Sequence, residues 1–438
     1  MHTRIKKLAT SYWSNDIAKA SFYTLMLQGA SKGCRLLLWI LLARIFTITQ
    51  FAQFAFGMSF AVICCRIIFL GGGPVLAREW GRSDLPDDER TTYILKVSNW
   101  YLWRGLLLTV VLLFGFWLFQ AFVQKTPTIN SVGFLAVALV LPFFIFQLIN
   151  ALYVAKRKVI VANLIEFIVN ITLLLIALCC GLWWHQSFLF VLQAQLLVFT
   201  FIIIGFLLIW QRKTILHSIK PSACIISFVS LQLGGVLFSL VDIVVLKLLS
   251  TAALLAHYSV ALQLNSIVAF GLVAINQNII SYIASDVKRL DKCQLQAKLS
   301  GYARVISAYT FIFFFGIVLL GYPILVLYGS TYTAAYWPLL LLSLGSLANG
   351  LCGSVTLLLA MSGRERFNAK VFWGAFLFNI ILSVCLVKPF GAIGVAFSVA
   401  VATMLWNIVM LIEVRRSIGV NPTILSRRFF KKREVCSD

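Results

Sequence analysis

The sequence is poor in charged residues, and acidic ones are especially scarce. Only 12% of its 438 residues are charged, and 14 aspartates and glutamates stand against 37 lysines and arginines. Hydrophobic residues make up 61% of the chain, with a mean hydropathy of +0.95, whereas soluble domains are about half apolar. The composition therefore indicates a polytopic membrane protein. The net charge of +23 does not indicate nucleic-acid binding, because the basic residues form short clusters between apolar runs.

The sequence also lacks the residue patterns of a catalytic or metal site. Its four histidines are scattered, and none has an acid or serine partner at a recognisable spacing. No CxxC or Cys/His spacing indicates a metal. The glycine-rich run LGGGPVL (70–76) lacks the Lys-Ser/Thr ending of a phosphate-binding loop. These absences argue against an enzyme and against an ATPase domain, and we expect no cofactor.

Apolar runs of roughly 20 residues, the length at which a helix crosses the hydrocarbon, predict twelve transmembrane helices. The breaks between them are short, and none could hold a soluble domain. The predicted helices are centred near Trp39, Arg66, Val111, Phe143, Ile171, Phe201, Gly235, Ala269, Phe314, Ser346, Ile380 and Ala402. The expected fold class is thus an all-α membrane protein.

The basic residues are divided unequally between the two sides of these helices. Twenty-nine of them fall on one side, within residues 4–19, 78–96, 156–158, 212–220, 288–304, 364–370 and 415–433. The opposite side carries Lys125 and Lys388. Since basic loops stay in the cytoplasm, both termini are predicted to be cytoplasmic.

Two pairs of segments favour an internal duplication. The stretch LLARIFTITQFAQFAF aligns with VLKLLSTAALLAHYSVAL, which pairs Arg44 with Lys247 and, with one gap, Phe54 with Tyr258. A second alignment pairs the stretch KRKVIVANLIEFIVN, which ends at Asn170, with GRERFNAKVFWGAFLFN, which ends at Asn379. The predicted domains are two parallel six-helix bundles, related by an axis along the membrane normal as in transporters that rock around a central cavity. They comprise residues 1–210 and 223–414, with a cytoplasmic linker at 211–222 and a basic tail at 415–438.

Two of the predicted spans carry cations near their middle. Span 22–46 contains Lys32 and Arg35, which share a helix face because they are three residues apart. Span 54–77 contains Arg66. If the first span began after Arg35, only eleven residues would remain, too few to cross. A charge that faces lipid costs several kcal/mol, so these cations must face a hydrated cavity or a counter-charge.

Acids that could neutralise them are scarce. Glu166 and Asp242 lie inside predicted spans, and we expect neither at the depth of Lys32 and Arg35. Structural ion pairing and a solvated cationic cavity both remain possible, and the shortage of acids favours the cavity. Such a cavity attracts anions. Because the chain has no filter-like loop, we expect a transporter of large anionic solutes, with the anion contacts in its N-terminal half.

The remaining polar residues inside predicted spans are mostly amides. Span eight contains Gln263, Asn265, Asn276, Gln277 and Asn278, and spans ten, five and eleven contain Asn349, Asn170 and Asn379. Amides in membrane helices usually hydrogen-bond neighbouring helices, and helix packing is the default interpretation. The alternative is that Gln263, Asn265, Asn276 and Asn278 line a lumen and contact sugar hydroxyls. Asp242 has two interpretations as well, an ion-coupling site or a local structural role, and Glu166 is a second candidate for coupling.

Several stretches together resemble one family of transporters. They are LLARIFTITQFAQFAFGMSFAVICCRIIFLGGGPVLAREWGR, DIVVLKLLSTAALLAHYSVALQL, PILVLYGSTYTAAYWPLLLLSLGSLANG, LLLAMSGRERF and KPFGAIGVAFSVAVATMLWN. They are similar to the multidrug/oligosaccharidyl-lipid/polysaccharide (MOP) exporter superfamily, and within it to the Wzx-type O-antigen flippases of the polysaccharide-biosynthesis branch. The resemblance implies a MATE-like, V-shaped pair of six-helix bundles.

The resemblance also implies a function. Such a flippase moves an undecaprenyl-pyrophosphate-linked oligosaccharide from the cytoplasmic to the periplasmic leaflet of the bacterial inner membrane, driven by a proton or sodium gradient. Its partners would be the lipid-linked substrate, membrane lipids, and the polymerase and chain-length proteins of the same pathway. In this picture Lys32, Arg35 and Arg66 meet the pyrophosphate or acidic sugars.

Three alternatives make different demands on the sequence. A multidrug/cation antiporter of the same superfamily would need acids in its cavity, where this chain has cations. A membrane glycosyltransferase or O-antigen polymerase would need a sizeable outer loop, whereas outer loops such as QKTPTINS and YGSTYTAAYW are short. A scaffold or channel without turnover is compatible with the cations, and we rank it below the flippase.

Overall fold

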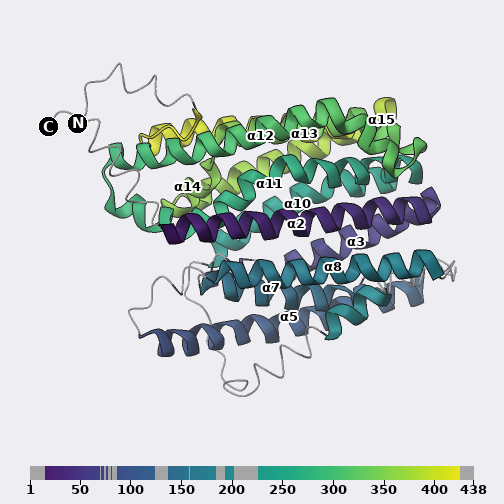
Figure 1. Cartoon of the computed structure of the whole chain (residues 1–438), viewed down its shortest axis with the longest axis horizontal. Helices are drawn as coiled ribbons and strands as arrows, with labels where there is room; N and C mark the ends of the chain where they lie inside the picture. Colours follow the sequence, from purple (N-terminus) through teal and green to yellow (C-terminus); the bar gives the residue numbers. More distant parts are fainter. Residues whose placement is uncertain are drawn as a thin grey trace.

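The chain folds into long helices that run side by side (Figure 1). A computed structural model describes residues 15–69, 71–73, 75–76, 80, 86–123, 137–156, 158–183, 193–201 and 225–424, and these contain no β-strand. The helices are α2 (Asn15–Ile45), α3 (Ile48–Ile68), α5 (Asp87–Val123), α7 (Val140–Ala155), α8 (Val159–Trp183), α10 (Ile225–Leu249), α11 (Ala252–Arg289), α12 (Lys292–Tyr328), the 3-10 helix η1 (Ser330–Ala335), α13 (Tyr336–Cys352), α14 (Val355–Met361) and α15 (Glu365–Ser417).

Tight turns join successive helices into hairpins. Between α2 and α3, Thr47 forms a capping box: its hydroxyl accepts a 3.4 Å hydrogen bond from the Gln50 amide, and its own amide donates to the Gln50 side chain at 3.1 Å. Between α10 and α11, the Thr251 hydroxyl accepts a 3.4 Å bond from the Leu254 amide. We call the end of the molecule that carries these two turns the hairpin end.

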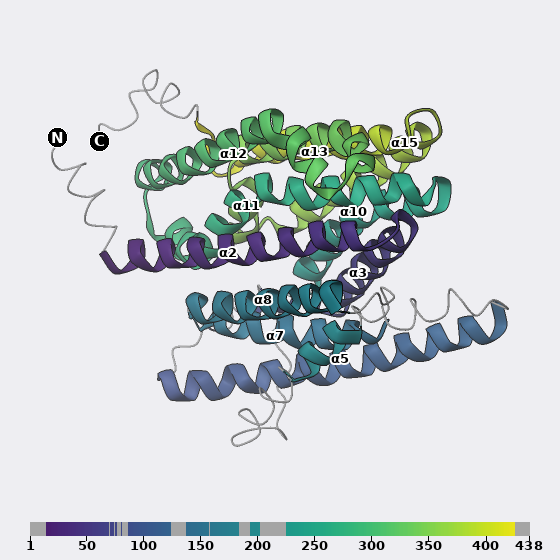
Figure 2. The same cartoon turned by 45° about the vertical axis from the view of Figure 1, so that its right-hand side comes forward.

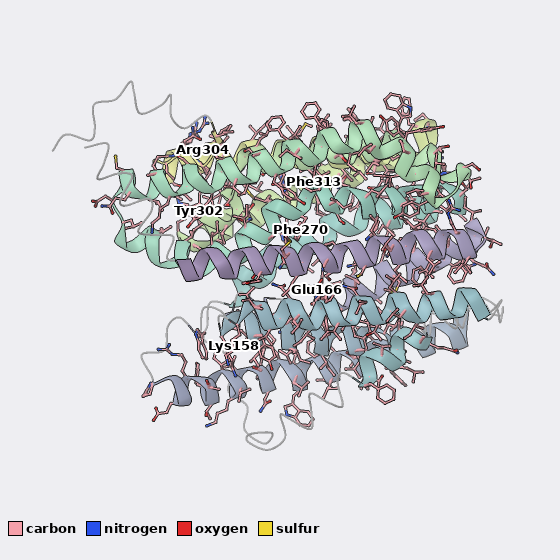
Figure 3. The ribbon with its side chains drawn as sticks, in the orientation of Figure 1. Lys158, Glu166, Phe270, Tyr302, Arg304 and Phe313 are labelled. Atoms are coloured by element: carbon pink, nitrogen blue, oxygen red, sulfur yellow. The ribbon has the colours of Figure 1, made fainter. Side chains whose placement is uncertain are left out.

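The opposite end carries the basic clusters. The turns α7–α8, α11–α12 and α14–α15 lie there, and Lys158 is near this end (Figures 1 and 3). We call it the basic end. The described parts of three clusters that the sequence assigns to one side of the membrane, at 156–158, 288–304 and 364–370, therefore share one end of the molecule.

The lengths of the helices agree with an all-α membrane fold. Seven helical segments of the described chain are long and apolar enough to cross a membrane. The 53-residue α15 is two helices merged across a kink at Gly391, where φ is 56° and ψ is −132°, just after Pro389. Its two arms correspond to the predicted eleventh and twelfth spans, while the total of twelve remains a prediction.

The helices form two groups (Figure 2), which share one part of the core. Helices α2, α3, α5, α7 and α8 form the first group, α10 to α15 form the second, and the main contacts between them join α2 and α3 to α10, α11 and α12. Residues of both groups, such as Phe51 and Tyr258, belong to one buried cluster. A second cluster, which includes Ile283 and Val414 near the basic end, draws only on the second group. The apolar core therefore joins the groups toward the hairpin end.

Candidate functional site

A polar seam runs between α2 and α8. Gln28 Nε2 on α2 donates a 2.9 Å hydrogen bond to Asn163 Oδ1 on α8. One turn along α2, the Ser31 hydroxyl accepts a 2.7 Å hydrogen bond from Asn170 Nδ2. Helical spacing places residues 28, 31, 32 and 35 on one side of α2, and residues 163, 166 and 170 on one side of α8. We call these seven residues the polar seam.

Glu166 lies in this seam beside the cations. It sits between Asn163 and Asn170 on α8, alongside α2 (Figure 3), and its charge acts on both Lys32 and Arg35. The prediction that Glu166 lies at another depth was therefore wrong. The error arose because α8 begins at Val159 and packs parallel to α2, which brings its second turn level with the middle of α2.

The third predicted cation approaches the seam from α3. Arg66 is in the last turn of α3, which ends at Ile68. Its placement in the middle of a 24-residue span (54–77) was wrong, because the chain turns at Phe69 and Gly71, where the glycine has a φ of 73°. Its charge nevertheless acts on Lys32 and Arg35.

The three cations are accessible at the surface of the protein. Lys32 and Arg35 are partly exposed and Arg66 is exposed. Glu166 forms no ion pair within 4.0 Å with these described cations, so the region keeps a positive excess.

Asp242 occupies a different position, toward the hairpin end of α10. Its side chain is 3% exposed. Its Oδ2 accepts a 2.6 Å hydrogen bond from the Tyr258 hydroxyl of α11, and its Oδ1 accepts one of 2.9 Å from the Ile243 amide. Among the described residues no cation pairs with this carboxylate. Lys247 instead places its ammonium 5.2 Å from the centre of the Phe56 ring.

Two of the predicted lumen amides are engaged in helix packing. Asn265 Oδ1 accepts a 2.9 Å hydrogen bond from the Ser346 hydroxyl, and Asn276 Oδ1 accepts one of 2.5 Å from the Ser354 hydroxyl. Gln263 is half-buried. The side chain of Asn278 lies outside the described residues.

Comparisons with known proteins bear on the fold. No family model and no curated protein matches the sequence. Solved structures match over nearly its whole length. A MATE transporter in complex with MaL6 matches with a TM-score of 0.66 and 14% identity, over 92% of this chain and 96% of that chain. The chain has the fold of MATE transporters.

Two further structures extend the comparison within the MOP superfamily. An inward-facing MATE multidrug transporter has a TM-score of 0.66 and 13% identity, over 91% of this chain and 98% of that one. A MOP superfamily transporter from Pyrococcus furiosus has a TM-score of 0.63 and 14% identity, over 92% and 95% of the two chains. These similarities establish the MATE fold for this chain.

Within this MATE fold, sequence reasoning missed the residues that join α2 to α8 beside the cations. Gln28, Ser31 and Asn163 were not predicted, although they lie at helical spacing from Lys32 and Glu166. That spacing was the available signal. The described residues contain no group of three or more histidines, cysteines or acids that could hold a metal ion.

Proposed function

We propose that the protein is a flippase for undecaprenyl-pyrophosphate-linked oligosaccharides. The observation that carries this proposal is the positive excess around the polar seam, where Lys32 and Arg35 of α2 lie in the seam with one acid, Glu166 of α8, and α3 adds the exposed Arg66. A pyrophosphate or an acidic sugar would supply the missing negative charge. Cations held by hydrogen-bonded helices can meet such an anion without rearranging.

The proposed setting is the bacterial inner membrane. The basic end would face the cytoplasm, where the lipid-linked substrate is made, and polymerase and chain-length proteins would take over the product on the other side. A membrane potential that is positive outside favours outward movement of an anion by about 2.3 kcal/mol per charge at 100 mV. A proton or sodium ion bound at Asp242 would reset the transporter.

The second candidate is a multidrug/cation antiporter. The fold supports it, because MATE multidrug transporters are among the structural neighbours. The charges favour the flippase, since the acid of the seam already interacts with two cations. The Pyrococcus furiosus transporter is reported to have a binding pocket of reverse polarity, which suggests a different function for it. Pocket charge therefore differs among proteins of this fold.

Transport by the purified protein in liposomes separates the two candidates. We expect a fluorescent undecaprenyl-pyrophosphate oligosaccharide to cross between leaflets, measured by its access to a membrane-impermeant quencher. We expect no uptake of a cationic dye under a proton or sodium gradient. Dye uptake without glycolipid movement would establish the antiporter, and movement of a neutral polyprenol at the same rate would contradict a role for the anion.

A further inference from the structure

Two cations related by the internal repeat each contact the opposite half of the molecule. Arg44, in the last turn of α2, donates from Nε to the Leu327 carbonyl of α12 at 2.5 Å. Lys247, in the last turn of α10, holds its Nζ 5.2 Å from the centre of the Phe56 ring on α3. The alignment of the two halves pairs these cations, so the contacts are reciprocal.

Both contacts are electrostatic, and both can be broken at little cost. Arg44 binds the C-terminal end of α12, where helix carbonyls lack helical partners and the helix dipole is negative. Lys247 lies over an aromatic face, which attracts cations. Both side chains are exposed, so water can solvate either charge once its contact is broken. Water gives no comparable compensation when a buried apolar contact is broken.

The same end carries an aromatic contact between the halves. The Phe51 ring of α3 meets Tyr332 of η1 edge to face, with the ring centres 5.6 Å apart. The His257 ring of α11 also packs on Tyr332, with the ring centres 5.8 Å apart. At the basic end the second group forms its own cluster. The described contacts therefore close the hairpin end and leave the basic end without a shared core.

We propose that Arg44 and Lys247 form a two-part latch that holds the hairpin end closed, and that its release is the step that opens the transporter toward that side. The latch acts between the halves, so this inference does not depend on which solute is carried. It assigns the described arrangement to the state that is open toward the basic end.

Distances between spin labels measure the state of the latch directly. In a cysteine-free background, one pair of labels replaces the exposed residues Thr49 and Thr331 at the hairpin end, and a second pair replaces the exposed Lys158 and Arg366 at the basic end. Electron–electron resonance on the full chain in lipid nanodiscs then reports both distances. Without a latch mutation we expect a short distance for the first pair.

The variant Arg44→Gln with Lys247→Gln should shift the ratio of open to closed hairpin ends by about tenfold, with the second pair moving closer together. The matched control is Arg104→Gln, because Arg104 contacts Trp100 within a single helix, 5.4 Å from its ring centre. It should leave both distances unchanged. The charge-preserving variant Arg44→Lys with Lys247→Arg should restore most of the closed population.

An unchanged distance distribution in the double glutamine variant would overturn the latch, and so would an equal shift in the Arg104→Gln control. Should the double variant fail to insert, Phe56→Leu tests one part with both cations intact. It removes the ring beneath Lys247 and should shift the same ratio in the same direction. No shift in Phe56→Leu would remove Lys247 from the latch.

Discussion

The Tyr258 hydroxyl and the Asp242 carboxylate are joined by a 2.6 Å hydrogen bond across the α10–α11 hairpin. The predicted repeat aligns these positions with Trp39 and Phe54, whose rings meet edge to face at 6.0 Å. One half therefore packs two apolar rings where the other buries an acid against a phenol. A polar pair at such a site weakens packing, and departures of this kind are expected where function requires them.

Replacing Asp242 by asparagine should uncouple transport from its ion gradient. Asp242→Asn keeps the shape of the side chain and removes the ionisable group. We expect glycolipid movement by the reconstituted variant to lose its response to imposed proton and sodium gradients. The control Tyr258→Phe removes the hydroxyl but keeps the carboxyl, and should retain the response. A full response in Asp242→Asn would show that the Asp242–Tyr258 pair has only a structural role.

Removing two of the cations should abolish glycolipid movement without destabilising the protein. We expect Lys32→Ala with Arg66→Ala to reach the membrane at the normal level, because removing Lys32 from the interior of α2 costs no insertion energy, and Arg66 is exposed in the last turn of α3. Transport should fall to background, while Arg104→Ala stays active. Normal transport by the double alanine variant would show that these cations serve only the structure.

Neutralising Glu166 should have the opposite effect on anion binding. Glu166→Gln removes the acid that competes for Lys32 and Arg35, so a pyrophosphate-containing sugar should bind more tightly, by about fivefold, or ~1 kcal/mol. Isothermal titration of the detergent-solubilised protein measures the Kd. The matched control is Glu413→Gln, which breaks the ion pair with Arg364 at the basic end of α15. Weaker binding by Glu166→Gln would mean that the acid itself contacts the solute.

Sequence reasoning predicted the fold class because hydropathy and charge act over whole helices. It placed Lys32 and Arg35 in the interior of α2, as the structure does. It failed where a local turn decides the outcome. The glycine turn after Phe69 ends α3 and moves Arg66 to its last turn, whereas hydropathy continues across this break.

The depth of Glu166 relative to Lys32 and Arg35 could not be predicted for a different reason. The position of a residue along α8 does not by itself fix its depth relative to residues of α2. That depth depends on where α8 begins and on how α8 packs against α2. The hydrogen bonds Gln28–Asn163 and Ser31–Asn170 set that register. They join residues far apart in sequence, so no local pattern reports them.

The side of the membrane on which the basic end lies is testable by labelling. Single cysteines at Thr128 and Arg157, in a cysteine-free background, lie in loops that the charge asymmetry assigns to opposite sides. In intact cells, a membrane-impermeant maleimide should modify position 128 and leave position 157 unmodified until the membrane is permeabilised. The reverse pattern would invert the topology and, with it, the direction proposed for transport.

The kink that separates the two arms of α15 should depend on glycine at position 391. Gly391 has a φ of 56° and a ψ of −132°, a region that side chains avoid, and a Cβ there would come within 3.2 Å of the Leu254 side chain. We expect Gly391→Ala to lower the free energy of unfolding by about 1–3 kcal/mol. Thermal unfolding in detergent, followed by tryptophan fluorescence, measures the loss of stability.

Gly374→Ala is the matched control, because Gly374 lies in the same helix and a Cβ there meets nothing within 4 Å. It should be neutral or stabilising, since alanine favours helix. Equal stability of the two variants would show that the chain turns at Pro389 without needing the glycine conformation.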